Sequence, residues 1–566
     1  MRRNSFLILS ACVLLVAACG KKGGKSGLMV PKDAAVVVHI NSQSLSSKLS
    51  WEEISQTNWF REMSKEAKDT LAKQLLADPA SSGIDTKADL VFYMKRQGKG
   101  SYLVFEGGLT STSSFEKLLQ EISKKEDSQT SEIKKDGDFS YMTSSHGNDG
   151  VIIWNKSNFA FLANAPLPDM KGMWGGGGYS SKQEFMLDSL LIFGKQSLTL
   201  SGSDNLDADS RFADLVKDGS DMHVWMNLDG YYGNLGPAMS LMKAGDVLFK
   251  ENLSATSLNF DNGKMTARSK QYYGEEMRNL LSKYKPANIS ADVINRIPSS
   301  NVAAVMAFNY PPDGLLAFLK VMGVDGMVNG YLAEMNYSIE EFVKANKGDV
   351  LLSVSDISIK EKQDTIDYGN GMKPYVHTSK RPDVKVLFAT SVNDKAAFEK
   401  LVTLAWETSR KMGANQEMPA ITYKIENNWF AASNAADQTN NFLAGTGNKQ
   451  AFADKITGHP LGFYLDLQKI IQSTAGSIVT DDDDKAITDA SLKMWQDVVA
   501  VGGDYKDKYV SFDFEVNLVD KSTNSLKQLN QYIDKISAIQ TAKRNRYRQE
   551  MMAPDSTTVE APPVVK

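Results

Sequence analysis

The sequence contains only two cysteines among its 566 residues, and both lie near its beginning, at Cys12 and Cys19. If residues 1–18 are a signal peptide, Cys12 is removed with it and Cys19 becomes the first residue of the mature chain, where its thiol would be taken up by the lipid. No cysteine then remains for a disulfide, a thiolate metal site or a cysteine nucleophile. Hydrophobic cores must therefore hold the fold together.

The first nineteen residues have the pattern of a lipoprotein export signal. Arg2 and Arg3 precede a short apolar run, and small residues stand directly before Cys19. This spacing predicts cleavage after residue 18 and acylation of Cys19. The run is far shorter than the ~20 residues of a spanning helix, so we expect residues 19–29 to tether a soluble body to the bilayer. Gly20, and the absence of a following acidic run, favour the periplasmic face of the outer membrane by analogy with known sorting rules.

An excess of basic charge is also missing, since 64 Lys and Arg residues stand against 68 Asp and Glu residues, for a formal net charge of −4. No domain has the basic excess typical of nucleic-acid binding, so we expect no nucleic-acid partner. The apolar fraction of 42% and the charged fraction of 23% are ordinary for globular proteins. At this length we expect two or more domains.

Motifs of known catalytic and metal sites are missing as well. The chain has no nucleophile elbow, no phosphate-binding loop and no closely spaced histidine pair, and its histidines are scattered at positions 39, 146, 223, 377 and 459. His39 and His223 lie in predicted strands, where we expect satisfied core or surface residues. A zinc site assembled from distant positions stays open, but the sequence gives no reason to expect a metal or a cofactor.

Two acidic clusters resemble metal loops. Asp481 to Asp484 could hold Ca²⁺, but contiguous carboxylates cannot all point at one ion, and a helix is predicted to follow with Ile487, Leu492, Trp495 and Val498 on its inner face. We interpret the run as a helix cap. Asp204, Asp207 and Asp209 do not fit an EF-hand, and we expect them to cap the helix at Phe212.

The chain resembles itself, because five blocks recur in the same order. They are a Pro-preceded strand at 36–41 and 305–309, a Lys-x-Asp strand at 87–92 and 347–352, a Phe-Glu-Lys-Leu helix at 115–122 and 398–405, a Phe-Ala-Asp helix and strand at 212–228 and 452–467, and a hairpin at 261–264 and 504–508. We expect Ser111 or Thr112 to cap the first Phe-Glu-Lys-Leu helix and Asn393 the second. The alternative is that similar short patterns of strands and helices recur by chance.

Within each half, strands joined by short turns, such as 90–94 with 102–105, predict antiparallel pairing. The fold class is therefore α+β, with two related halves of helices packed on mainly antiparallel sheet. We place the first half at 30–285 and the second at 290–540. We expect strand aromatics such as Trp225, Tyr464 and Phe512 to be core, and a disordered tail at 547–566.

A glycine run lies between Trp174 and Tyr179. It predicts either a plain connector or a mobile loop that presents these two aromatic residues to a sugar ring or a protein partner.

The signal, the Val30 to Ala34 strand entry and the Phe212 helix followed by a strand with Asn227 resemble a family of Bacteroidetes lipoproteins known only as a domain of unknown function (the 4836 type). The resemblance runs roughly from Val30 to Ile533. It implies location and size, and no catalytic residue.

Three functions remain open. The first is a lipid-anchored, non-enzymatic scaffold or protein-interaction module of the cell envelope. The second is a carbohydrate- or peptide-binding accessory of nutrient uptake, with Trp174 and Tyr179 in a cleft between the halves. The third is a hydrolase, which would need a cleft with two facing carboxylates, one with a perturbed pKa. The sequence does not decide whether the chain is an enzyme, but the missing motifs favour a non-enzyme.

Overall fold

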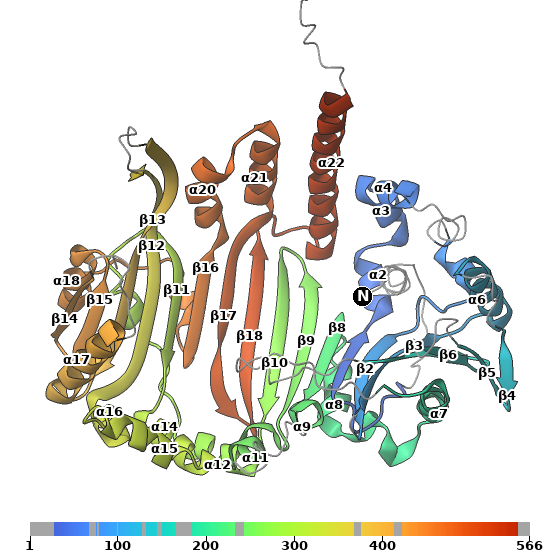
Figure 1. Ribbon diagram of the computed structural model, residues 1–566, viewed down its shortest axis with the longest axis horizontal. Helices are drawn as coiled ribbons and strands as arrows, with labels where there is room; N and C mark the ends of the chain where they lie inside the picture. Colours follow the sequence, from blue (N-terminus) through green and yellow to red (C-terminus); the bar gives the residue numbers. More distant parts are fainter. Residues whose placement is uncertain are drawn as a thin grey trace, which may run out of the picture.

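The computed structural model describes residues 28–66, 75, 78–98, 100–126, 132–143, 150–165, 184–232, 243–366, 375–411 and 421–552. Within these ranges eighteen strands form one sheet with helices along its ends and faces (Figure 1). Every strand pairing is antiparallel. The α+β class predicted from the sequence is therefore confirmed.

The strands of the sheet occupy two stretches of the chain. Those of the first stretch are β1 (Val36–Ile40), β2 (Leu90–Gln97), β3 (Gly100–Gly108), β4 (Lys134–Asp136), β5 (Phe139–Thr143), β6 (Val151–Trp154), β7 (Asn158–Asn164), β8 (Met222–Asn227), β9 (Leu253–Asp261) and β10 (Lys264–Tyr272). Those of the second are β11 (Val302–Asn309), β12 (Asn346–Ile366), β13 (Tyr375–Val392), β14 (Thr422–Glu426), β15 (Trp429–Ser433), β16 (Leu461–Asp466), β17 (Trp495–Lys506) and β18 (Tyr509–Leu518).

The helices lie between these strands in the chain. In the first stretch they are α2 (Ser42–Lys48), α3 (Trp51–Ser55), α4 (Asn58–Glu66), the 3₁₀ turn η2 (Pro79–Ser82), α6 (Thr112–Glu126), α7 (Leu187–Leu198), the 3₁₀ turns η4 (Gly202–Asp204) and η5 (Leu206–Ala208), α8 (Ser210–Val216), α9 (Leu228–Tyr232), α11 (Lys243–Phe249) and α12 (Glu275–Lys283). In the second they are α13 (Ala291–Ile294), α14 (Pro312–Met322), α15 (Asp325–Ala333), α16 (Ile339–Ala345), α17 (Lys395–Lys411), α18 (Ala436–Ala444), α19 (Ala453–Ile456), α20 (Leu467–Ile478), α21 (Asp482–Met494) and α22 (Ser525–Met552).

The sheet is continuous across the two predicted halves. Its spatial order is β4-β5-β6-β7-β3-β2-β1-β8-β9-β10 and then β18-β17-β16-β11-β12-β13-β15-β14. The two stretches meet where β10 pairs with β18, in a register that runs from Lys264 opposite Asn517 to Tyr272 opposite Tyr509. We call this pairing the seam.

The strand order is the same on both sides of the seam. Moving outward from it, β10-β9-β8-β1-β2-β3-β7 matches β18-β17-β16-β11-β12-β13-β15, and the next strand is β6 or β14. Where the paired registers match, a residue of one strand set thus has a corresponding residue in the other. For example, His39 on β1 corresponds to Ala307 on β11, because Val91 and Leu351 lie opposite them.

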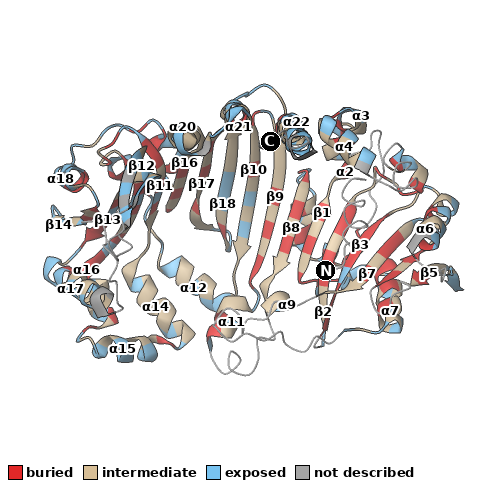
Figure 2. Cartoon of the chain, turned by 45° about the horizontal axis from the view of Figure 1, so that its top comes forward, coloured by how far each residue is buried: buried red, intermediate tan, exposed pale blue. Residues whose placement is uncertain are grey.

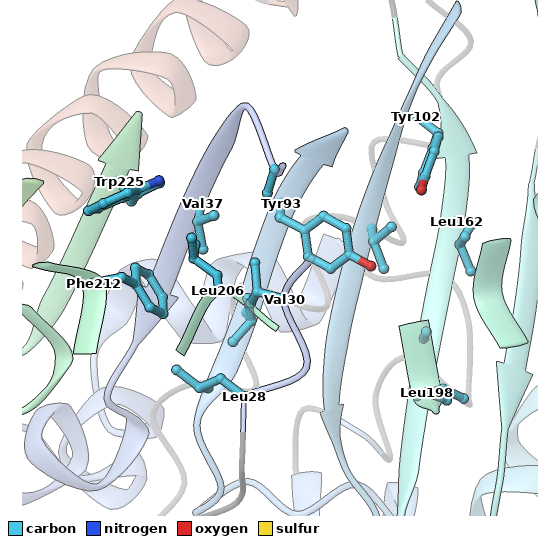
Figure 3. Packing of buried hydrophobic residues seen from close by; sticks show 14 of the residues in the cluster. Leu28, Val30, Val37, Tyr93, Tyr102, Leu162, Leu198, Leu206, Phe212 and Trp225 are labelled. Atoms are coloured by element: carbon cyan, nitrogen blue, oxygen red, sulfur yellow. The ribbon is translucent and has the colours of Figure 1, made fainter. Parts of the chain in front are cut away.

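Alternating side chains place the core on both faces of the sheet. On one face, buried residues of β1 to β9 pack under α7, α8 and the N-terminal segment (Figures 2 and 3). Buried residues of β11 to β17 form a second cluster on this face with α13, α18 and α19. On the opposite face, Phe115 and Leu119 of α6 cover Leu90 and Phe105, while Phe398 of α17 covers the other end.

The predicted local elements are confirmed where they lie within the described ranges. The 90–94 and 102–105 strands pair as β2 and β3, and the hairpins at 261–264 and 504–508 join β9 to β10 and β17 to β18. Helix α22 continues to Met552, so the chain is helical for several residues after Tyr547, where we expected the tail to begin.

The helix caps agree with the predictions in part. Asp481 accepts the backbone N–H of Asp484 at 2.8 Å and caps α21, which confirms the cap interpretation of the acidic run. Asp209 caps α8, but Asn205 rather than an aspartate caps η5. Asp394, not Asn393, caps α17, because its carboxylate accepts the N–H of Ala397 at 3.0 Å.

Two predictions are wrong, one about the end of a helix and one about the burial of a strand residue. Trp495 and Val498 belong to β17, since α21 ends at Met494. Phe512 was expected in the core, but its side chain is 37% exposed, whereas Trp225 and Tyr464 are buried as expected. The physical reason is that alternation fixes which face a strand residue is on, but not whether that face is covered.

Within the described ranges, no single helix has the length and apolar composition to cross a membrane. The two helices Pro312–Met322 and Asp325–Ala333, which are bent relative to each other, meet these criteria only when they are counted together.

Candidate functional site

Two histidines that are 184 residues apart in the chain meet inside the first core. Strands β1 and β8 are neighbours, and their register places His39 directly opposite His223. Their rings are stacked with centroids 5.1 Å apart, and Nδ1 of one lies 2.9 Å from Nδ1 of the other. The side chains are only 2% and 1% exposed. We call them the histidine pair.

A carboxylate stands at each end of the histidine pair. Nε2 of His39 lies 3.1 Å from Asp89, directly before β2, and Nε2 of His223 lies 2.8 Å from Asp218, in the loop before β8. Burial lowers the pKa of His223, although Asp218 opposes that effect. Hydrogen bonds from His223 and Ser220 lower the pKa of Asp218, against the opposing effect of its partial burial.

A third carboxyl group lies on the same face of the sheet. Glu106 on β3 is opposite Val91, which is itself opposite His39. Burial raises the pKa of Glu106 to about 8, and Tyr93 lies within 3.4 Å of its carboxyl group. Burial without a cation favours the neutral form of this carboxyl group, because its charged form is poorly solvated.

Glu106 and Asp89 line one small cavity, of about 20 Å³, together with Leu28 and Met29 of the N-terminal segment. The hydrolase hypothesis predicts two carboxyl groups in one cavity, one of them with a perturbed pKa, and this cavity has both features. The volume admits about one water molecule and no substrate.

A larger groove of about 590 Å³ lies over the seam. Strands from both sides of the seam line it, together with Lys455 of α19 and Lys521. Most of its charges are satisfied internally: Arg268 lies 3.7 Å from Asp513, and Lys455 lies 2.7 Å from Asp497. Partial burial lowers the pKa of Lys521. The groove is therefore polar but has little net charge to attract an ion.

The opposite face of the sheet carries an open apolar surface between α6 and α17. Its central row crosses six neighbouring strands through Phe388, Leu352, Met306, Phe463, Ala500 and Phe514. The two flanking rows hold Thr390, Val350, Phe308, Leu461, Gly502 and Phe512, and Val386, Val354, Ala304, Leu465, Val498 and Val516. We call these three rows the open apolar face.

No member of the open apolar face is charged, and several of its large side chains are exposed. The exposed fractions of Phe388, Leu352, Met306 and Phe514 are 38%, 40%, 40% and 43%. Contiguous exposed apolar surface of this kind marks sites of interaction with proteins or membranes.

The residues predicted from the sequence to carry function lie elsewhere. Cys19, Trp174 and Tyr179 fall outside the described residues, and so does His146. Among the described residues, no group of three or more histidines, cysteines or carboxylates could hold a metal ion.

Sequence reasoning placed His39 and His223 in strands but missed that they meet. The recurrence of the strand blocks was the only signal that could have indicated which strands are neighbours. It did not fix the pairing of β1 with β8.

The model of the family described as Domain of unknown function (DUF4836) matches residues 28–369. This range is more than half of the chain, so the chain belongs to that family. The match ends well before Ile533, to which the resemblance was expected to extend. No curated protein and no solved structure matches the chain.

Proposed function

We propose that this member of the DUF4836 family is a lipid-anchored, non-enzymatic scaffold of the cell envelope, and that its open apolar face binds an amphipathic helix of a partner protein. The anchor would be the acylated Cys19, with the body on the periplasmic face of the outer membrane. The observation that carries the proposal is the uncharged row from Phe388 to Phe514, in which Phe388, Leu352, Met306 and Phe514 are exposed.

The size of the open apolar face selects a helix as its occupant. Six strands at a spacing of about 4.8 Å give a length of about 24 Å, and three rows give a width of about 14 Å, or roughly 340 Å². A second copy of this chain would need about 800 Å² per partner for a stable dimer. An α-helix of about 15 residues is about 22 Å long and about 10 Å wide, and so matches the surface.

The chain itself covers this face of the sheet in the same way at both ends. Helix α6 packs Phe115 and Leu119 on β2 and β3, and α17 packs Phe398 on β15. A partner helix would therefore repeat a packing mode that the sheet already uses twice. Because no charged residue lies in the three rows, the partner's contact stripe must be apolar.

We also propose that residues 30–285 and 290–540 are duplicated units that share one sheet. The matching strand order on both sides of the seam supports this proposal. The carbohydrate-binding and hydrolase alternatives have weaker support, since the charges of the seam groove pair with one another and the cavity beside Glu106 is too small for a substrate.

The binding proposal is tested by photocrosslinking in living cells. A photoreactive amino acid replaces Leu352 in the full-length protein, and the adduct is mapped by mass spectrometry. We expect a crosslink to a partner segment with an apolar helical stripe, and its loss when Met306→Lys is added. The control places the same group at Met327 of α15, which is 68% exposed but outside the open apolar face. A crosslink only to phospholipid, only to a second copy, or to nothing would overturn the proposal.

The anchor is tested separately. Palmitate labelling should mark the wild-type protein, and Cys19→Ala should abolish both the label and sedimentation with membranes. A Cys19→Ala protein that still sediments with membranes would contradict the anchor without bearing on the open apolar face.

A further inference from the structure

The four side chains Asp89, His39, His223 and Asp218 lie in one series with three polar contacts. Counting the protons available for these contacts shows that one contact has none. Nε2 of His223 lies 2.8 Å from the Asp218 carboxylate, which can only accept, so we assign a proton to this nitrogen; in the neutral ring Nδ1 is then an acceptor. The contact of 2.9 Å then requires His39 to donate from Nδ1. Nε2 of neutral His39 is therefore a bare acceptor that points toward another acceptor, Asp89.

The geometry at Nε2 of His39 agrees with this count. The atom is fully buried and has no hydrogen-bond partner in the described part of the chain, although Asp89 is 3.1 Å away. A buried nitrogen without a partner is costly. One added proton would remove the conflict, since imidazolium donates from both nitrogens.

The charges around the histidine pair favour that proton. Asp89 and Asp218 face the two ends, and Asp207 of η5 interacts with His39, while Lys217 is the cation near Asp207. Glu106, which shares a cavity with Asp89, adds no charge at pH 7 because burial keeps it protonated. The carboxyl groups of Asp89, Asp218 and Asp207 thus lie near two rings that can share one positive charge.

The fold does not require this arrangement. At the corresponding register positions across the seam, His39, His223 and Glu106 are replaced by Ala307, Gly462 and Ala389. The residue that corresponds to Asp89 is Asp349, which accepts a hydrogen bond of 2.8 Å from Asn309. The same strand pairing is therefore built there from small apolar residues. The histidine pair belongs to the first stretch alone.

The histidine pair lies beneath the segment through which the chain enters the fold. The carbonyls of Leu28 and Val30 accept hydrogen bonds from Asn205 and Leu206, at 2.6 and 2.7 Å. Figure 3 shows Leu28, Val30 and Leu206 close together against the sheet. Asp207 follows Leu206 directly, so a positive charge on His39 would attract the same turn that holds this segment.

We propose that Nε2 of His39 is a proton-binding site and that filling it fastens the entry segment, Leu28 to Lys32, to the sheet. The proton comes from solvent, and the carboxylate of Asp89, 3.1 Å away, accepts the new hydrogen bond. With this proton bound, hydrogen bonds connect Asp89, both rings and Asp218 without a break. They link β1 and β8 to the loops that precede β2 and β8. At higher pH the proton leaves and the entry segment is held less firmly. If Cys19 is the anchor, this segment would be where the tether pulls on the body.

The proton site is tested by NMR of the full-length protein with ¹⁵N-labelled histidine. At the alkaline end of the titration we expect His223 as the Nε2–H tautomer and His39 as the Nδ1–H tautomer, and on acidification of the folded protein we expect His39 to become imidazolium. Asp89→Asn should move the His39 transition to lower pH. A His39 ring that stays neutral until the protein unfolds, or that starts as the Nε2–H tautomer, would overturn the proposal.

The fastening is tested by hydrogen exchange at the Leu206 amide, whose acceptor is the carbonyl of Val30. After correction for intrinsic rates, exchange should slow about tenfold when the site is filled, as expected for one pKa unit of differential interaction. His39→Gln should remove this dependence on pH. Asp504→Asn is the matched control, because it breaks the His459–Asp504 pair of 2.6 Å, far along the chain. Equal protection of Leu206 at both ends of the titration would overturn the fastening even if His39 titrates.

Discussion

The ammonium group of Lys48 lies 2.6 Å from the carboxylate of Asp221, whose side chain is completely buried. Ser44 and the backbone N–H of Phe260 also donate to this carboxylate, each at 2.6 Å. Asp221 therefore joins α2 to the strands β8 and β9 through charge-assisted hydrogen bonds.

Asp221→Ala should lower the free energy of unfolding by about 3 kcal/mol, because it leaves Lys48 and a buried N–H without their acceptor. Urea denaturation measures this loss. The comparison is Glu62→Ala, which breaks an exposed pair with Lys65 and should cost less than about 1 kcal/mol. Equal costs for the two variants would show that the Asp221 network adds nothing to stability.

Glu106 should make the protein less stable as the pH rises. Its pKa is about 8 in the folded protein, above its ordinary value, so between these values the folded state binds more protons than the unfolded state. Stability from this group is therefore full at acidic pH and declines until about pH 8. Glu106→Gln should flatten that part of the curve of melting temperature against pH. Glu52→Gln, on exposed α3, should leave the curve unchanged. An unaltered slope in Glu106→Gln would contradict a raised pKa.

The hairpin at the seam should be intolerant of a side chain at Gly263. Its φ is +69°, and a Cβ there would lie 2.5 Å from the Cα of Lys521. Gly202 has a similar φ of +62° but open space around it. Gly202→Ala should cost about 1 kcal/mol of strain, whereas Gly263→Ala should cost clearly more, because backbone must also move. Chemical denaturation of both variants separates the two effects, and equal costs would mean that the loop at Lys521 yields freely.

The acidic run should act through Asp481 and not through calcium. The backbone N–H of Asp484, followed by Lys543, lowers the pKa of Asp481, and Lys543 lies 2.9 Å from its carboxylate. Asp481→Asn should preserve most of the melting temperature, since asparagine also caps, while Asp481→Ala should lower it. Added Ca²⁺ should change neither value. A rise in melting temperature with Ca²⁺ in the wild type, lost in Asp481→Ala, would restore the calcium hypothesis.

Much of the local structure could be predicted because it depends on residues a few positions apart. The turn at Asn262 and Gly263 predicts its hairpin from two residues, and the stripe that begins at Phe115 predicts α6 from one turn to the next. The predicted cap at Asn393 was wrong by a single residue, since a cap can move to the adjacent Asp394 with little change in energy.

The candidate sites could not be predicted in this way. His39 and His223 are separated by 184 residues, and their chemistry appears only when β1 and β8 become neighbours. Phe512 was placed in the core because strand aromatics are usually buried, but no helix in the described part of the chain covers this region of the sheet. Whether a side chain is exposed depends on whether another element covers that face of the sheet. The sequence of the strand itself does not contain this information.

By itself, the sequence determined the α+β class, the hairpins, the helix cap at Asp481 and the recurrence of strand blocks, because each depends on short-range patterns of apolar, turn and capping residues. Only the tertiary structure decided that β10 joins β18 in one continuous sheet, that two distant histidines stack, and that one apolar face stays open. These features depend on which strands pair over long separations. That choice is set by the sum of many weak contacts over the whole chain rather than by any local signal.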